Sequence, residues 1–162
     1  MKVVPLFGLS VLMSFLAYGI VTKLYILPQL RGMRREEAIL PLVVPHTFRF
    51  VGLSFLIPGV VSPSLPSAFA VPAAYGDLVA AILAVVATFA LSTRAAWSFA
   101  IVWAFNVWGA LDLLNAFYQG LIGVRFRPGW LGAAFFIPTL VVPALLTSHG
   151  LIFWLLLRRK HP

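Results

Sequence analysis

The sequence predicts an all-α membrane protein, a polytopic bundle of five transmembrane helices. Of its 162 residues, 62% are hydrophobic and only 10% are charged, and the mean hydropathy is +1.02. A soluble chain carries about 25% charged residues to cover its surface. Apolar runs of roughly 20 residues, the length that crosses a bilayer, recur along the whole chain. These observations exclude a soluble domain, and the lack of short alternating segments excludes a transmembrane β-barrel.

Turn residues and charge clusters divide residues 1–162, a single transmembrane domain, into five predicted spans. The first, at 4–26, continues past Ala17-Tyr18-Gly19 and is too long for the apolar core of a signal peptide. After the cluster RGMRREE, the second span at 36–60 contains Pro41 and Pro45, which should bend its helix. The other spans are predicted at 77–91, 96–121 and 130–157.

The third span is predicted to begin at Asp77, which caps the helix on the outer side. Small residues repeat every four positions around it, at Gly76, Ala80, Ala84 and Thr88. Such a ridge permits close approach of another helix.

Basic residues are distributed unevenly between the two sets of loops. One set contains seven: Arg31, Arg34, Arg35, Arg94, Arg158, Arg159 and Lys160. The other contains three: Lys2, Arg125 and Arg127. The positive-inside rule therefore predicts an outside N-terminus and a cytoplasmic C-terminus for a multi-pass protein of the cell inner membrane. Because the net charge of +8 resides in these loops, no nucleic-acid partner is expected.

The fourth span contains an unusual set of polar residues. Trp108, Asp112, Asn115 and Gln119 follow helical spacing and share one face, whereas Asn106 falls on the other side. Polar groups are costly at membrane depth, so this face should look into protein rather than lipid.

The second span offers a partner for that face. His46 and Arg49 are three residues apart, and Arg49 lies too deep to reach either surface easily. Asp112, the only acid expected deep in the membrane, lies at a compatible depth. An ion pair between Arg49 and Asp112 is therefore predicted.

His149 in the fifth span is expected at nearly the same membrane depth as His46, judged from the number of residues between each histidine and the end of its span. Two imidazoles at matched depth are able to ligate a haem iron or another metal ion. The sequence has no HxxxH pair and no carboxylate one turn away, which disfavours such a site.

Two interpretations of the Arg49–Asp112 pair remain open at this stage. It locks two spans together, or Arg49 binds an anionic headgroup with Asp112 as counter-ion or proton acceptor. The leading hypothesis is binding of a small amphiphile, such as a membrane lipid, isoprenoid, quinone or haem. It predicts a pocket lined by Trp108, Phe48 or Phe50 and polar groups. The candidate ligand-binding residues are His46, Arg49, Trp108, Asp112, Asn115, Gln119 and His149.

Two other classes of function are also considered. A membrane enzyme acting on a lipid or isoprenoid would use His46 or Asp112 as acid or base, although no motif such as GxSxG or HExxH supports it. A mechanism with two carboxylates would need Asp77 and Asp112, which are expected at different depths. A structural subunit of a larger complex would use the small-residue ridge if that ridge faces outward. A homo-oligomer is a separate alternative that does not depend on the ridge.

Overall fold

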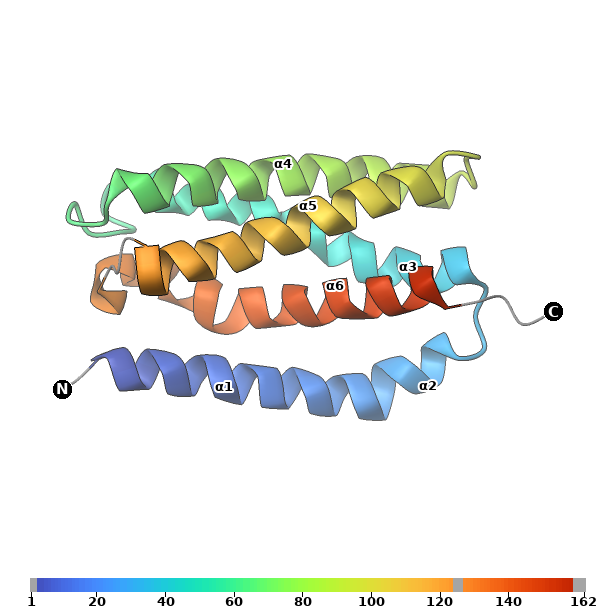
Figure 1. Cartoon of the computed structure of the whole chain (residues 1–162), viewed down its shortest axis with the longest axis horizontal. Helices are drawn as coiled ribbons and strands as arrows, with labels where there is room; N and C mark the ends of the chain where they lie inside the picture. The colour runs from blue at the N-terminus through green and yellow to red at the C-terminus, as the bar shows by residue number, and fades with distance from the viewer. Residues whose placement is uncertain (1–2, 124–126, 159–162) are drawn as a thin grey trace.

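The computed structural model describes residues 3–123 and 127–158, and this part of the chain is helical, without a β-strand. It contains five helices long and apolar enough to cross a bilayer, which is consistent with a multi-pass membrane protein. They run along the long axis of the molecule, with the two termini at opposite ends (Figure 1). Their bounds are Val4–Leu30, Arg35–Leu56, Ser67–Ser92, Ser98–Gly123 and Ile137–Leu157. Four of the basic residues used to predict orientation, Lys2, Arg125, Arg159 and Lys160, lie outside the described residues.

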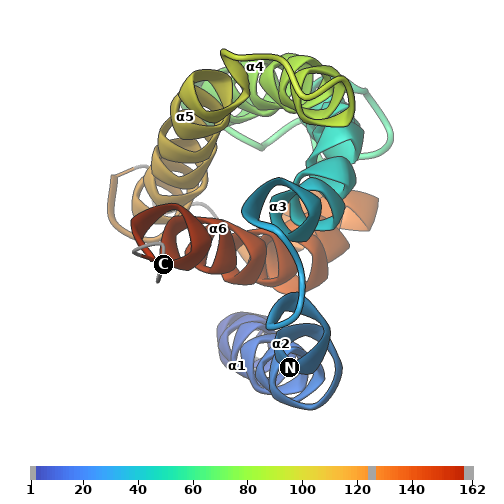
Figure 2. The ribbon, with the colours of Figure 1, turned by 90° about the vertical axis from the view of Figure 1, so that its right-hand side faces the viewer.

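The first span lies beside a ring formed by the other four (Figure 2). It consists of α1 (Val3–Val21), the π-helical turn η1 (Thr22–Ile26) and α2 (Leu27–Leu30). Only 11% of its most apolar stretch is buried, against 44% in α4. The ring, rather than α1, therefore encloses most of the buried residues.

The second span changes helix type part-way along. Helix α3 (Arg35–Val43) continues into η2 (Val44–Leu56), a 3-10 helix of 13 residues. Where Pro41 and Pro45 predict a bent α-helix, the chain instead winds more tightly. A 3-10 helix has three residues per turn, so residues i and i+3 lie above one another. The buried residues of η2 follow this period: His46, Arg49, Gly52 and Phe55.

Helix α4 (Ser67–Ser92) begins ten residues before the predicted start at Asp77. The uncharged, proline-containing stretch at 61–75 was expected to be a connection, but Pro72 lies inside the helix. Burial of Phe69 and Ala73 compensates for the one backbone donor that Pro72 lacks. The prediction that Asp77 caps this helix is therefore wrong, because Asp77 is buried ten residues beyond its first residue.

The small-residue ridge on α4 faces other spans of the same chain. Gly76, Ala80 and Ala84 are buried, and α4 packs chiefly against η2 and α5. The alternative in which this ridge faces outward to bind a partner is therefore wrong.

The last two spans enclose the remaining sides of the ring. Helix α5 (Ser98–Tyr118) ends in the π-helical turn η3 (Gln119–Gly123). The final span consists of η5 (Ile137–Val141) and α6 (Val142–Leu157). The predicted span at 130–157 starts too early, because η4 (Pro128–Phe135) is a separate segment interrupted by non-helical backbone at Gly132.

The backbone on either side of Gly132 is hydrogen-bonded to the loop that follows η2. The amide of Ala133 donates to the carbonyl of Val60 over 3.0 Å, and the amide of Ser62 donates to the carbonyl of Trp130 over 2.8 Å. A Cβ at Gly132 would overlap the Val60 oxygen, and the residue has a φ of +52°. Only glycine satisfies both the dihedral angle and the close approach.

Gly132→Ala is expected to destabilise the protein more than Gly59→Ala. Both residues have positive φ, but a Cβ at Gly59, with a φ of +88°, would meet nothing within 4 Å. We expect a loss of about 1–2 kcal/mol for Gly59→Ala from the dihedral angle alone. Gly132→Ala should cost about 1–3 kcal/mol more because of the overlap. Unfolding in mixed detergent micelles measures both, and equal losses would contradict the proposed role of the Val60 contact.

Candidate functional site

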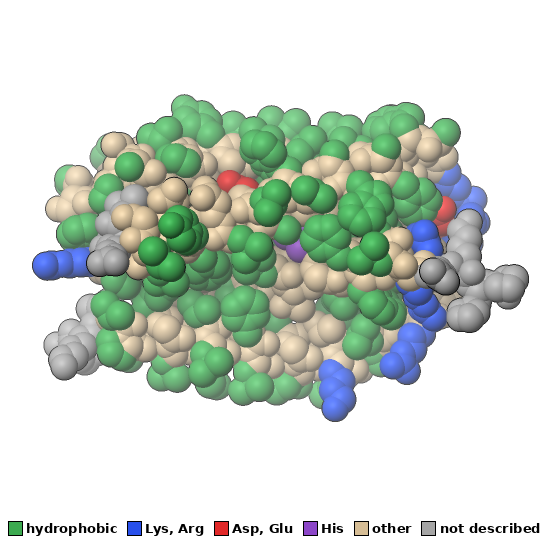
Figure 3. Space-filling view, in the orientation of Figure 1, with side chains coloured by type: hydrophobic (Ala, Val, Ile, Leu, Met, Phe, Trp, Pro, Cys, Tyr) green, Lys and Arg blue, Asp and Glu red, His purple; other side chains and the backbone are tan. Residues whose placement is uncertain are grey.

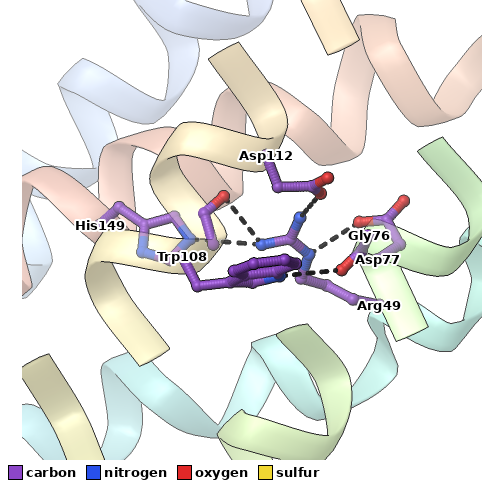
Figure 4. A network of polar contacts seen from close by, with 7 residues as sticks. Arg49, Gly76, Asp77, Trp108, Asp112 and His149 are labelled. Atoms are coloured by element: carbon purple, nitrogen blue, oxygen red, sulfur yellow. Dashed lines mark hydrogen bonds and ion pairs between the residues drawn. The ribbon is translucent and has the colours of Figure 1, made fainter. Parts of the chain in front are cut away.

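Arg49 lies at the centre of the ring, 2% exposed, and all three of its guanidinium nitrogens have acceptors (Figure 4). Its Nε donates to Oδ1 of Asp77 over 2.7 Å, and its Nη2 donates to Oδ2 of Asp112 over 2.7 Å. Its Nη1 donates to the carbonyl of Gly109 over 3.1 Å. The predicted Arg49–Asp112 pair is present, and a second acid completes it.

His149 lies against the other side of the guanidinium. Its Nε2 is 3.4 Å from Nη1 of Arg49, and its Nδ1 is 2.7 Å from Oδ1 of Asn106. Because a guanidinium only donates, Nε2 accepts and Nδ1 carries the proton. The Asn106 amide nitrogen in turn donates to the His149 carbonyl over 3.3 Å. Asn106, predicted to lie away from the polar face, thus positions His149 as a neutral imidazole.

His46 packs beside this group without a hydrogen bond. Its ring centroid is 4.3 Å from that of His149 and 5.0 Å from that of Phe105. It is fully buried, and neither ring nitrogen has a partner among the described residues. The predicted proximity of the two histidines is therefore present.

The geometry of the histidine pair does not fit a haem iron or another metal ion. The free lone pair of His149 points at the positively charged Arg49, where a metal cation would be repelled. The described residues also contain no group of three His, Cys, Asp or Glu side chains placed to hold a metal. His149 instead acts as an acceptor for Arg49.

Three glycines make room for the charged groups. At each, an added Cβ would overlap a polar side chain from another helix. Three of the four helices of the ring, η2, α4 and α5, therefore leave space for side chains of other helices, which allows four charged or polar groups to meet in an otherwise apolar interior. The contacts are Gly52 on η2 with Asp77 on α4, Gly76 on α4 with Asp112 on α5, and Gly109 on α5 with Arg49 and with His149 on α6.

A cavity of about 40 Å³ adjoins the acid pair. It has room for about three water molecules or one small headgroup. Asp77 and Asp112 are the charged members of its wall, and the rest is apolar. Acidic side-chain atoms are visible at mid-length on the surface between α4 and α5 (Figure 3). The apolar wall consists of Phe7, Phe55, Phe69, Ala73, Leu113, Ala116, Phe117, Gly120, Leu121, Ile137, Pro138 and Val142.

The predicted lining of this pocket is wrong. Phe48 and Phe50 are 64% and 52% exposed on the outside of η2, and Trp108 is 46% exposed. Trp108 instead donates from Nε1 to the carbonyl of Gly76 over 3.4 Å, which links α5 to α4 beside the acid pair. His46 does not line the cavity either, so an acid/base role for it in that space has no geometric support.

The predicted polar face of α5 does not point into the ring. Asn115 is exposed and Gln119 is half-buried, and neither lines the cavity. The buried stripe of α5 lies roughly a third of a turn away from the polar stripe. Asp112 reaches Arg49 from the seam between α4 and α5. The buried residues are Ser98, Val102, Phe105, Asn106, Gly109, Ala110 and Leu113.

Asp77, Asn106 and the glycines are the site residues that the sequence analysis missed. A signal for part of the site was present in the second span, where His46, Arg49, Gly52 and Phe55 recur every third residue. That period is typical of a 3-10 helix rather than an α-helix. A 3-10 helix in the second span would have placed Gly52 on the same buried side of the helix as Arg49.

The family model described as a domain of unknown function, DUF8737, matches residues 6–157. The chain belongs to this family. The match covers the last four apolar helices in full, the first from residue 6 onward, and every residue of the Arg49 cluster. No curated protein and no solved structure matches the chain.

Proposed function

We propose that this chain is a multi-pass inner-membrane protein, with its N-terminus outside and its C-terminus in the cytoplasm, that binds a lipid-like amphiphile. One observation carries the proposal: the cavity is apolar and aromatic over most of its wall and ends on two carboxyl groups. Such a wall matches a molecule with an apolar tail and a polar head. The uneven distribution of basic loop residues supports the orientation.

The two ends of the cavity contribute differently to binding. Phe55, Phe69 and Phe117 are placed to contact the part of the tail next to the headgroup. The cavity of about 40 Å³ does not hold a long chain, so the rest of the tail would extend into the bilayer. A tail gains little on leaving the bilayer, because lipid chains are as apolar as the cavity wall. Selectivity must therefore come from the acid pair, where a headgroup finds hydrogen-bond acceptors that lipid chains do not offer.

Native mass spectrometry of the detergent-extracted protein tests this proposal. Wild-type protein is expected to retain a bound amphiphile. Ala116→Phe, which fills the cavity from α5, should lose it. Ala104→Phe is the matched control, because Ala104 is exposed on the same helix and does not line the cavity. Absence of any adduct in wild type, or equal retention in both variants, would overturn the proposal.

A membrane enzyme acting on a lipid or isoprenoid is the second candidate. It is favoured by one observation, the position of Asp112 in the cavity wall beside a second acid, where it is placed to exchange a proton with a bound molecule. Deuterium incorporated from D2O into added amphiphile, or another change in its mass, that Asp112→Asn abolishes would identify turnover. An amphiphile whose mass is unchanged in both H2O and D2O would leave binding as the function.

A further inference from the structure

We propose that the headgroup bound beside Asp77 and Asp112 is a cation with N–H donors, as in an alkylamine or another ammonium amphiphile. The inference rests on the proposed function and adds the chemical class of the ligand. It depends on the net charge of the cluster, on the carboxylate oxygens that Arg49 leaves free, and on the inaccessibility of Arg49 itself.

The charges of the cluster do not balance. Two carboxylates, from α4 and α5, face one guanidinium from η2. His149 from α6 is neutral because its Nε2 accepts from Arg49. The walls from α1 and η5 are apolar among the described residues. With both acids ionised, the cluster carries one net negative charge in apolar surroundings, and a cation at the cavity neutralises it.

The acids also have unused hydrogen-bonding capacity. Asp77 uses Oδ1 and Asp112 uses Oδ2 for Arg49. The second oxygen of Asp77 lies against Gly52 and that of Asp112 lies against Gly76, and neither is bonded to the guanidinium. Among the described residues, the hydrogen bonds to Asp77 and Asp112 both end on the other oxygen of each carboxylate. A carboxylate accepts several hydrogen bonds, so an ammonium group with two or three N–H donors is a suitable partner.

An anionic headgroup, in contrast, has no cation to bind here. Arg49 is 2% exposed, each of its nitrogens already has an acceptor, and it does not line the cavity. An anion entering the cavity would meet two carboxylates first and be repelled. The interpretation in which Arg49 recognises an anionic headgroup therefore lacks geometric support.

Competition among four amphiphiles with the same twelve-carbon chain tests the inference in protein reconstituted into nanodiscs. Dodecylamine, dodecyltrimethylammonium, dodecanol and dodecanoate separate charge from N–H donation. Dodecylamine should bind best and dodecanoate worst. Asp112→Asn and Asp77→Asn each remove the excess negative charge, and each should weaken dodecylamine binding at least about tenfold while changing dodecanol binding little.

Two patterns would overturn the cation assignment while leaving amphiphile binding intact. One is equal affinity for dodecylamine and dodecanol that neither Asp variant changes, which would mean that a proton already neutralises the acid pair. The other is that dodecanoate binds more tightly than the other three amphiphiles. Ala116→Phe reports separately on the proposed function: if it binds all four amphiphiles as wild type does, the cavity is not the binding site and both proposals fail.

Discussion

Arg49→Met should destabilise the protein by about 3–5 kcal/mol, the range measured when one partner of a buried ion pair is removed. The substitution keeps an apolar chain of similar length but leaves Asp77 and Asp112 facing each other without the cation that both contact over 2.7 Å. It also removes the donor to the Gly109 carbonyl. Titration of detergent micelles with SDS, followed by tryptophan fluorescence, measures the loss.

A triple variant shows whether charge causes this loss. Adding Asp77→Asn and Asp112→Asn to Arg49→Met removes the unpaired charges and should recover more than half of the lost stability. Arg49→Lys should be intermediate, because an ammonium keeps the charge but cannot bind three acceptors in the directions that a planar guanidinium does. A triple variant as unstable as Arg49→Met alone would mean that the packing of Arg49, not its charge, stabilises the ring.

Composition and span length were sufficient to predict the helical class and the number of apolar helices. Both are set by the bilayer, which demands roughly 20 apolar residues per helix whatever the details. Helix ends were less predictable where proline occurs. Pro72 lies inside α4 because Phe69, Ala70, Ala73 and Ala74 on the inner side of this turn are buried, and this tertiary packing outweighs the local preference of proline.

The site was predictable only where charge required a partner. Arg49 needed an anion at membrane depth, and Asp112 was the only acid expected away from the ends of the predicted spans. Asp77 was missed because the predicted start of its helix placed it at the surface. The error of ten residues moved an acid of the cluster to a capping position.

The orientation of α5 was not predictable from its polar residues. Asn115 and Gln119 suggested one face, but Gly109 and Asn106 define the buried one. Glycine gives no hydropathy signal of its own. Its importance comes from the side chain of a neighbouring helix that occupies its space, and this information depends on which helices are adjacent.

Gly76→Ala should cost about 2–4 kcal/mol, although alanine normally favours a helix by about 1 kcal/mol over glycine. The added methyl group would overlap Oδ1 of Asp112, so the carboxylate must turn away and its bond to Arg49 is strained or lost. Gly150→Ala is the matched control, because a Cβ there would meet nothing within 4 Å. It should be neutral or stabilising by up to about 1 kcal/mol.

A double-mutant cycle with Asp112→Ala identifies the source of that cost. If the methyl group acts by displacing the Asp112 carboxylate, Gly76→Ala should lower the free energy of unfolding only slightly in the Asp112→Ala background. The coupling energy would then be about 1–3 kcal/mol. The same unfolding titration measures all four proteins of the cycle. An equal cost in both backgrounds would instead indicate that Gly76 sets the distance between the α4 and α5 backbones. In that case the position of Asp112 would be a consequence of helix packing and not the reason for a glycine at residue 76.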